Sequence, residues 1–448
     1  MHFLRTPRPR RSTLLVPLAT ALVALVLFLA GPSGVAAQAG VAAAVDEGPR
    51  SALPWAEPEE VGIDPAGLEK LSAAMHKLVD DGQLAGVLTA VARKGKLVHW
   101  ETYGQRDLAS GKPVEDDTIF RIYSMTKPIV GVALMTLYDE GRFQLDDPVS
   151  KYIPQLGGLK VAVADGPEGT PELADAERDM TIRELMSHTG GLTYGIFGRS
   201  QTDILYQKAN ILDRDQTLEQ MADKLAELPL LNPPGAKWQY SVSVDVQGYL
   251  IEVLSGKKLG EFLRERIFEP LGMTDTAFWV TPEKVERFAT LYVPDNEGNL
   301  QPQPADEYLT PPTFESGGGG LVSTAHDYLR FAQMLLSGGE LDGVRILKPE
   351  SVALMSRNQL PEGVTELAPI YPGNLFGLDF AIVDQPSERT DHPKAKSEYW
   401  WYGIGGTWFG INPTEDLIVL GMIQSRGGRA AFQARTEGKR IVYEALQQ

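Results

Sequence analysis

The spacing of apolar residues predicts an amphipathic helix and a β-hairpin in the first part of the chain. Between Pro65 and Gln83, apolar side chains recur every three or four positions and so share one face of a helix. Two apolar runs follow, at 85–92 and 97–103, and the short turn Arg93-Lys94-Gly95-Lys96 separates them. Apolar runs joined by a glycine-containing turn are typical of a β-hairpin.

The C-terminal part of the chain shows strand patterns again. Apolar runs at 375–383, 398–411 and 417–424 predict three strands, the second interrupted by glycines, and the polar stretch 412–416 is the turn between the last two. A helical pattern at 430–446 follows.

The middle of the chain, from 145 to 320, has a different pattern, in which helical segments alternate with long loops that contain glycine and proline. The predicted helices are 181–187, 217–227, 243–255 and 261–268. Strand patterns at both ends and helices in the middle predict an α/β sandwich, in which one antiparallel sheet is built from both ends of the chain and covered by helices. We expect this domain to comprise 54–144 and 321–448, with 145–320 as a helix-rich insertion domain.

The first 39 residues have the pattern of an export signal. Arginines without any acidic residue precede an apolar run at 14–30, and Ala37-Gln38-Ala39 offers the small residues of a cleavage site. Residues 40–53 are small and polar, which predicts a flexible leader. We therefore expect a periplasmic or extracellular protein without stable membrane association after signal removal. A retained N-terminal membrane anchor is the alternative.

Charge and cysteine content exclude several functions. The 448 residues carry a formal net charge of −17, which argues against nucleic-acid binding by bulk electrostatics. The chain has no cysteine, which excludes disulfides, cysteine-ligated zinc, iron–sulfur clusters and thiol catalysis. The oligomeric state is not predictable from the sequence.

The stretch from Phe120 to Pro128 carries the candidate chemistry. Ser124 and Lys127 are three residues apart and share one face of a predicted buried helix that ends at Gly141. We expect Ser124 at the N-cap, where the helix dipole favours negative charge and disfavours a protonated lysine. A buried Lys127 would have a lowered pKa and could be the base that a serine nucleophile needs.

The pattern Ser-x-x-Lys is weak evidence by itself. A second copy, Ser255-Gly256-Lys257-Lys258, lies at the end of a helical pattern, where a glycine cap and lysines complement the helix dipole. The first copy has a similar structural alternative, an N-cap serine followed by a solvated lysine. Two motifs of other hydrolases, Gly-x-Ser-x-Gly and His-Glu-x-x-His, do not occur in the chain. His188 is the best candidate for a catalytic histidine, but its His-Thr-Gly context is more typical of a packed turn.

A site built on serine and lysine also needs a second proton-handling group and an oxyanion hole. Tyr240, just before the predicted helix 243–255, is the candidate for the first role, since a nearby lysine charge would help it to lose its proton. The alternative is a buried tyrosine that anchors a loop. The glycine-broken, aromatic stretch 401–408 could supply N–H groups that pair with that of Ser124, or it could be a bulged strand with an aromatic cluster.

Three of these segments together resemble a known family. Phe120 to Pro128 resembles the Ser-x-x-Lys motif of serine β-lactamases and penicillin-binding proteins, most closely the class C branch and its esterase relatives, the family VIII carboxylesterases. Tyr240-Ser241-Val242 lies where the family has Tyr-x-Asn. Trp401-Tyr402-Gly403 lies where β-lactamases have Lys-Thr-Gly and the esterases often have Trp-Gly-Gly. The order and spacing agree from about 55 to 445.

The resemblance implies an α/β sandwich with a helical domain and an active site in the cleft between them. It implies that Ser124 is the acylated nucleophile and that Lys127 and Tyr240 share the base and later acid work. The backbone N–H groups of Ser124 and Ile404 would form the oxyanion hole. No metal or cofactor is expected.

Departures from the family motifs bear on the substrate. Trp401, Tyr402, Gly403 and Val242 lie at positions that would contact it. Val242 replaces an amide and Trp401 replaces a lysine, and each lost contact to a charged group is worth about 1.5–3 kcal/mol. Both changes favour neutral substrates over penicillins, while the bulk of Tyr402 alters the expected acyl pocket.

The sequence therefore predicts an exported serine hydrolase that cleaves carboxylic esters through an acyl-enzyme on Ser124. A β-lactamase, or a D-alanyl peptidase or other amide hydrolase, would use the same residues and is the main alternative. Acyl transfer to an acceptor other than water also fits them. A non-catalytic binding protein of the same fold is the alternative from another class.

Overall fold

The computed structural model describes residues 53–365, 367, 371–387 and 392–447. The predicted export signal, and all but the last residue of the predicted leader, lie outside these residues. The described residues form one compact unit. Among the helices described, none combines the length and the apolar character that crossing a membrane requires.

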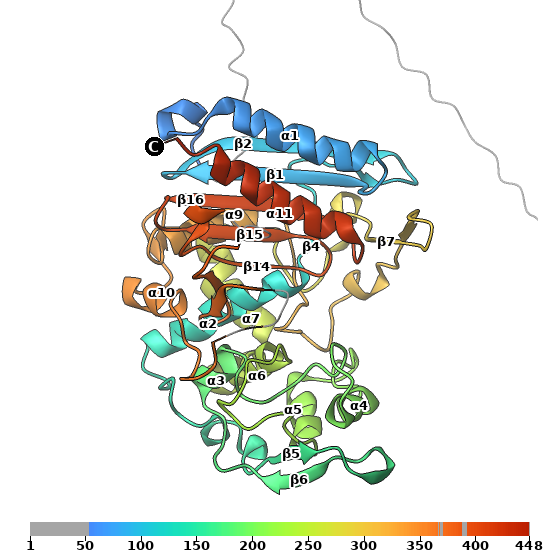
Figure 1. Ribbon diagram of the computed structural model, residues 1–448, viewed down its shortest axis with the longest axis vertical. Helices are drawn as coiled ribbons and strands as arrows, with labels where there is room; N and C mark the ends of the chain where they lie inside the picture. Colours follow the sequence, from blue (N-terminus) through green and yellow to red (C-terminus); the bar gives the residue numbers. More distant parts are fainter. Residues whose placement is uncertain (1–52, 366, 368–370, 388–391, 448) are drawn as a thin grey trace, which may run out of the picture. The chain divides into compact units, whose positions relative to one another are not determined.

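The centre of the fold is an eight-stranded sheet in which all paired strands are antiparallel (Figure 1). In spatial order its strands are β12 (Asn374–Phe376), β13 (Ala381–Val383), β14 (Tyr399–Tyr402), β15 (Trp408–Asn412), β16 (Leu417–Ile423), β1 (Gly86–Arg93), β2 (Lys96–Asp107) and β3 (Lys112–Pro113). The strand β1, from the first part of the chain, pairs with β16, from the last part, so both parts contribute to one sheet. The predicted fold class is therefore confirmed.

The predicted hairpin at 85–103 is confirmed as β1 and β2, and Lys94 and Gly95 form its turn with positive φ. Two predicted strands are wrong in extent. The run 375–383 forms the hairpin β12–β13, in which Asp379 takes a positive φ of 63°. The run 398–411 forms the hairpin β14–β15, with Gly403–Thr407 as its turn and Gly406 at a φ of 97°. Turn residues that favour positive φ divide both apolar runs, and apolar pattern alone does not show this.

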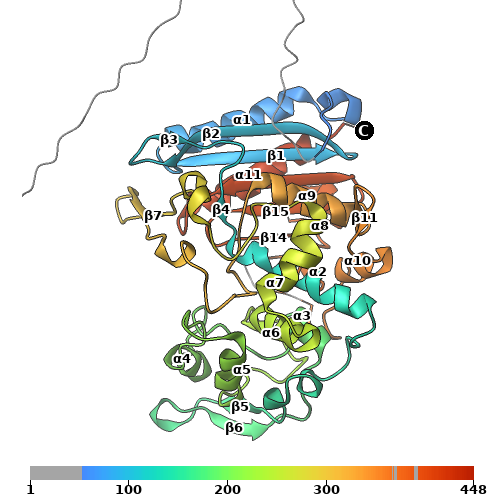
Figure 2. The same cartoon turned by 180° about the vertical axis from the view of Figure 1, so that it is seen from behind.

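Helices cover both faces of the sheet because each has one apolar face to bury. On one face α1 (Pro65–Asp80) and α11 (Arg429–Glu444), from opposite ends of the chain, lie side by side (Figure 1). On the other face α9 (Ala325–Leu336) packs against β15 and β16 (Figure 2). The long buried helix α2 (Thr126–Asp139) ends with Gly141 at a φ of 73°, which confirms the predicted glycine terminator.

The middle of the chain is rich in short helices, as predicted. They are α3 (Ile182–Met186), α4 (Gln201–Lys208), α5 (Leu218–Ala226), α6 (Ser243–Ser255), α7 (Leu259–Leu263) and α8 (Glu269–Leu271), and α10 (Pro349–Met355) follows later. Short strand pairs accompany them: β4 (Phe120–Arg121) with β9 (Val322–Ser323), β5 (Lys160–Ala164) with β6 (Glu172–Asp175), β7 (Tyr292–Pro294) with β8 (Leu300–Pro302), and β10 (Glu340–Leu341) with β11 (Val344–Arg345). The helix α6 packs against α2, α3 and α5, so it joins this region to the helix that carries Lys127. The division into two domains stays a prediction.

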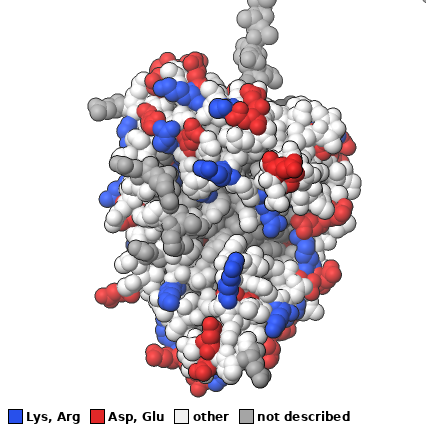
Figure 3. Space-filling view, turned by 45° about the vertical axis from the view of Figure 1, so that its right-hand side comes forward, with Lys and Arg blue, Asp and Glu red and all other residues white. Residues whose placement is uncertain are grey.

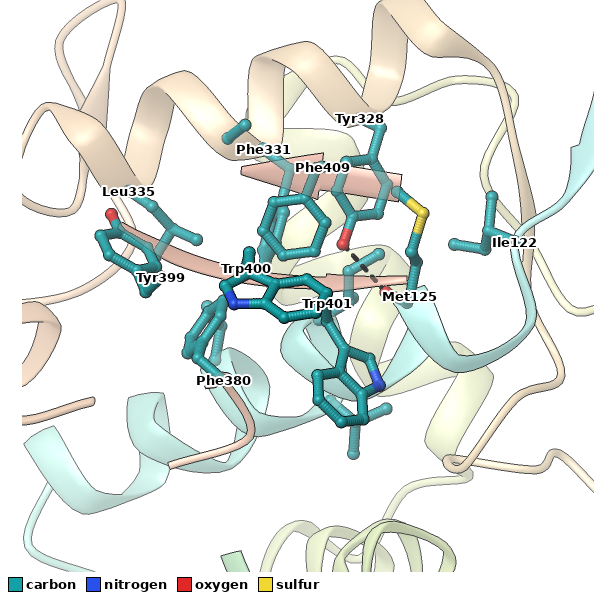
Figure 4. Packing of buried hydrophobic residues seen from close by; sticks show 14 of the residues in the cluster. Ile122, Met125, Tyr328, Phe331, Leu335, Phe380, Tyr399, Trp400, Trp401 and Phe409 are labelled. Atoms are coloured by element: carbon teal, nitrogen blue, oxygen red, sulfur yellow. Dashed lines mark hydrogen bonds between the residues drawn. The ribbon is translucent and has the colours of Figure 1, made fainter. Parts of the chain in front are cut away.

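Buried aromatic side chains fill the space between α9 and the strands β14 and β15 (Figure 4). Within this core the hydroxyl of Tyr328, on α9, donates a hydrogen bond of 3.0 Å to the carbonyl of Met125. Because Met125 follows Ser124 directly, this bond attaches the candidate nucleophile's turn to a helix on the sheet.

The packing of Trp408 against Gly421 gives a test of this core. The two residues are cross-strand neighbours, and a Cβ at Gly421 would lie 2.0 Å from the buried Trp408 ring. We expect Gly421→Ala to lower the free energy of unfolding in urea by about 1–3 kcal/mol, because an overpacked core must shift. The cost should fall when Trp408→Phe removes the overlapping ring atoms. An equal cost in both backgrounds would contradict this account.

Candidate active site

Ser124 lies in a tight turn just before α2. It belongs to the 3₁₀ turn Tyr123–Met125, and the N-cap position of α2 is Met125, so the expected N-cap role of Ser124 is wrong. Tyr123 takes a φ of 44°, which is a strained conformation for a residue with a large side chain. The pairing of β4 with β9 on one side, and the Tyr328–Met125 hydrogen bond on the other, hold this turn in place.

Two side chains from distant parts of the chain meet at the Ser124 hydroxyl. The Lys127 amine lies 3.2 Å from Ser124 Oγ, and the Tyr240 hydroxyl donates to the same oxygen at 2.8 Å. Lys127 comes from the first turn of α2, whereas Tyr240 comes from the loop before α6. The structure therefore brings together the three residues singled out as a catalytic set.

The surroundings of Lys127 favour its neutral form. Its side chain is buried, and burial lowers the pKa of the amine to about 7, while the nearby charges of Asp245 and Asp379 act in the opposite direction. The amine donates to the carbonyl of Gly318 at 2.5 Å, and it lies 4.7 Å from the centre of the Tyr240 ring. A lysine with these properties can accept a proton at neutral pH.

Asp245 fixes the loop that supplies this carbonyl. One oxygen of its fully buried carboxyl accepts hydrogen bonds from the Gly318 N–H at 3.0 Å and the Ser316 hydroxyl at 2.5 Å. A Cβ at Gly317 would lie 2.4 Å from the Val244 carbonyl, so a larger residue would push the loop off α6. Three glycines of this loop, Gly318, Gly319 and Gly320, also line the pocket beside Ser124.

Tyr240 is held in its neutral form. Burial raises the pKa of its phenol, and the hydrogen bonds to Ser124 and Trp401 oppose this only in part. The expectation that Tyr240 loses its proton more easily is therefore wrong, because burial dominates the pKa of the phenol. The hydroxyl of Tyr240 is placed as a proton donor to Ser124.

His188 has a structural place behind Tyr240. It is fully buried, burial lowers its pKa well below the ordinary value, and its Nδ1 lies 3.1 Å from the hydroxyl of Ser241. Its ring packs against Tyr240 with ring centres 5.0 Å apart. His188 thus contacts the tyrosine, as expected for a packed residue, and its hydrogen bond goes to Ser241.

The turn that carries Ile404 lies directly against the nucleophile's turn. A Cβ at Gly403 would lie 2.3 Å from the Ile122 carbonyl, and one at Gly405 would lie 2.8 Å from the Tyr123 ring. Only glycine fits at these two positions, which explains the glycine-rich stretch. Ile404 and Ser124 line the same pocket, and their role as the oxyanion hole stays a prediction.

The four expected substrate contacts have different surroundings. Val242 and Trp401 are buried in the core, and neither lines the pocket beside Ser124. The Trp401 indole N–H instead faces the Tyr240 hydroxyl at 3.4 Å. Tyr402 and Gly403 line a separate hollow of about 200 Å³ that shares Ile404 with the main pocket. Their contact with substrate stays a prediction.

A pocket of about 300 Å³ opens beside Ser124, and its walls are largely aromatic and apolar. Its lining residues are Tyr123, Ser124, Tyr194, Ile196, Phe197, Leu212, Arg214, Tyr240, Phe278, Glu307, Tyr308, Pro312, Phe314, Ser316, Gly318, Gly319, Gly320, Ile404 and Arg426. The sequence analysis missed most of these residues because they come from loops without a periodic pattern. In the described residues, no group of three or more His, Cys, Asp or Glu side chains is placed to hold a metal ion.

Comparison with known proteins identifies the family. Residues 71–443 match the Beta-lactamase family. The chain belongs to this family. Its relatives include esterases and acyltransferases, which confirms the predicted enzyme class, a serine hydrolase related to carboxylesterases and β-lactamases.

Three relatives illustrate its range. Protein Rv1367c of Mycobacterium tuberculosis is 38% identical over 365 residues, which cover 80% of this chain and 90% of the relative. Esterase EstB of Burkholderia gladioli is 30% identical over 389 residues, which cover 81% and 92%. The solved structure of EstCE1, a hydrolase with promiscuous acyltransferase activity, has a TM-score of 0.71 at 27% identity and covers 83% of this chain and 98% of its own.

The environment of Lys127 predicts an unusual titration. In spectra of protein labelled with ¹³C at lysine Cε, we expect a signal that is absent from Lys127→Arg and has a midpoint near pH 7. Asp245→Asn should move this midpoint to lower pH, because the Asp245 charge raises the pKa of the amine. The exposed Asp416→Asn is the matched control and should leave it unchanged. A midpoint at about 10.4, as in a solvated lysine, would contradict the assignment.

Proposed function

We propose that this member of the Beta-lactamase family hydrolyses carboxylic esters through an acyl-enzyme on Ser124. The observation that carries the proposal is the Ser124 hydroxyl, which both Lys127 and Tyr240 contact at the edge of a largely apolar pocket. The similarity to esterase EstB and to the hydrolase EstCE1 supports the reaction class.

In the proposed mechanism Lys127 is the first base. Its amine is neutral in part of the molecules near pH 7, whereas burial keeps the phenol of Tyr240 protonated. The amine accepts the Ser124 proton as Oγ bonds to the ester carbonyl carbon, and the backbone N–H groups of Ser124 and Ile404 receive the developing oxyanion. Tyr240 gives its proton to the leaving alcohol oxygen and regains one from Lys127. Water then attacks the acyl carbon and loses a proton to the same pair. The bond between this carbon and Ser124 Oγ breaks, Oγ takes a proton from the pair, and the acid leaves.

Transfer of the acyl group to another alcohol uses the same steps with that alcohol in place of water. The promiscuous acyltransferase activity described for EstCE1 supports this second outcome. An apolar pocket that accepts an alcohol and excludes water favours transfer over hydrolysis.

The β-lactamase alternative requires a cation where β-lactamases have the lysine of Lys-Thr-Gly. In this chain Trp401 has that place, and its indole is buried against Tyr240. We therefore favour esters over β-lactams. Efficient turnover of a chromogenic cephalosporin would show that another residue holds the substrate carboxylate.

The nucleophile is tested by comparing the two Ser-x-x-Lys copies. We expect Ser124→Ala to reduce hydrolysis of a short-chain p-nitrophenyl ester by about a thousandfold or more and to abolish labelling by a fluorophosphonate probe. Ser255→Ala, in the second copy at the end of α6, is the matched control and should leave both ester hydrolysis and probe labelling unchanged. Unchanged ester turnover in Ser124→Ala would refute the assignment. Failure of the folded wild-type protein to react with the probe would favour the non-catalytic alternative.

We also propose that residues 1–39 direct export. The arginines, apolar run and small-residue site in this segment support the proposal. In a bacterial host we expect the full chain to accumulate outside the cytoplasm, shortened after Ala39, and a chain that begins at residue 40 to stay in the cytoplasm. A full-length protein that is recovered uncut in the membrane fraction would favour a retained anchor.

A further inference from the structure

One positively charged side chain in the lining of the pocket beside Ser124 has no opposite charge paired with it in the described part of the chain. The charged residues in its lining are Arg214, Glu307 and Arg426. Arg214 and Glu307 form an ion pair of 3.0 Å with each other. Arg426 is exposed at the end of β16, and within the described residues its side chain has no carboxylate or other hydrogen-bond partner.

A second arginine, Arg121, adds positive charge close to Tyr123 in the pocket lining. Arg121 is fully buried, and its guanidinium donates to the backbone carbonyls of Ala289 and Pro304 at 3.2 Å each. These two carbonyls accept hydrogen bonds from the guanidinium but leave its charge in place. Burial raises the pKa of the Tyr123 phenol, and the charges of Arg121 and Arg426 both act against that rise. Their fields therefore reach the residue directly before Ser124.

This local charge is opposite to that of the whole protein. The chain carries a net charge of −17. On the face seen in Figure 3, several Lys or Arg side chains border the hollow in the middle. A positive site in an acidic protein attracts an anion locally without making the whole surface bind anions.

The rest of the pocket is built for an apolar group. At its mouth Ile196 and Phe197 are 60% and 57% exposed, which is unusual for such side chains. Hydrogen bonds anchor the two ends of their loop, because Asp203 accepts from the hydroxyls of Thr193 and Ser200 at 2.7 Å each. Two large apolar side chains are thus exposed to solvent at the pocket beside the nucleophile.

We propose that this site selects esters that carry a carboxylate, with Arg426 holding the carboxylate and the aromatic pocket holding an apolar chain. The inference rests on the proposed esterase function and adds its substrate class. It also replaces the preference for neutral substrates, which followed from the loss of the motif lysine at Trp401. Arginine suits this role because its planar guanidinium can hold both oxygens of a carboxylate.

Matched esters test the proposal and show on which side of the ester bond the carboxylate lies. The first pair is mono-4-nitrophenyl adipate and 4-nitrophenyl hexanoate, in which a carboxylate replaces the terminal methyl group of the acyl chain. The second pair is 4-(hexanoyloxy)benzoate and its methyl ester, in which the carboxylate is on the leaving alcohol. We expect wild-type kcat/KM to favour the charged member of at least one pair.

Variants of neighbouring arginines locate the effect. Arg426→Gln should lower the charged-to-neutral ratio of kcat/KM by about 3- to 10-fold, as for the loss of a partly exposed charge-assisted contact. Arg426→Lys should lower it less, since the charge remains. Arg429→Gln removes the same charge three residues later, outside the pocket lining, and should leave the ratio unchanged. A ratio that Arg426→Gln leaves intact, or that Arg429→Gln lowers equally, would overturn the proposal.

A binding measurement separates this inference from the catalytic proposal. In the Ser124→Ala background, octanoate binding measured by calorimetry should weaken by about 3- to 10-fold when Arg426→Gln is added, whereas 1-octanol binding should change less. Equal octanoate affinities in the two proteins would overturn the carboxylate site. If no ester is hydrolysed through Ser124, the esterase proposal fails, and the octanoate comparison still decides whether Arg426 holds a carboxylate.

Discussion

The burial of one amine is the constraint on which this site depends. Lys127 can act as a base near neutral pH only because its side chain is removed from water, and several distant segments are needed to achieve this. The first turn of α2 places the amine 3.2 Å from Ser124, Asp245 holds the Gly318 carbonyl that receives its hydrogen bond, and the ring of Tyr240 covers it. The same burial keeps Tyr240 protonated, so one environment gives the two groups complementary roles.

The sheet provides the rigidity that this arrangement requires. The hairpin β14–β15 brings its turn against Ile122 and Tyr123, and glycines at 403 and 405 allow a contact that no side chain would permit. From the other side Tyr328 holds the carbonyl of Met125. The strained conformation of Tyr123 is thus fixed on two sides, which is how a folded chain maintains a local backbone arrangement of high energy.

In the proposed function, substrate selection depends on different residues from those of the chemistry. The motif position that is a lysine in β-lactamases is here a buried tryptophan that contacts Tyr240, so it contributes to the position of the tyrosine hydroxyl. A cation is nevertheless present, because Arg426 reaches the pocket from the end of β16. Because Arg426 lies outside the family motifs, the loss of the motif lysine does not leave the pocket without a positive charge.

The sequence alone determined the local features of this protein. Periodicity located the β1–β2 hairpin, α2 and α6, and motif spacing singled out Ser124, Lys127 and Tyr240, because these signals depend on residues close together in the chain. It placed Ser124 at an N-cap and missed two hairpin turns, because a few backbone dihedral angles decide those details. Only the tertiary structure decided the charge states and the pocket. Segments distant in the chain bury Lys127 and Tyr240, and Arg214 and Arg426 line one pocket with Ser124 only in the folded protein.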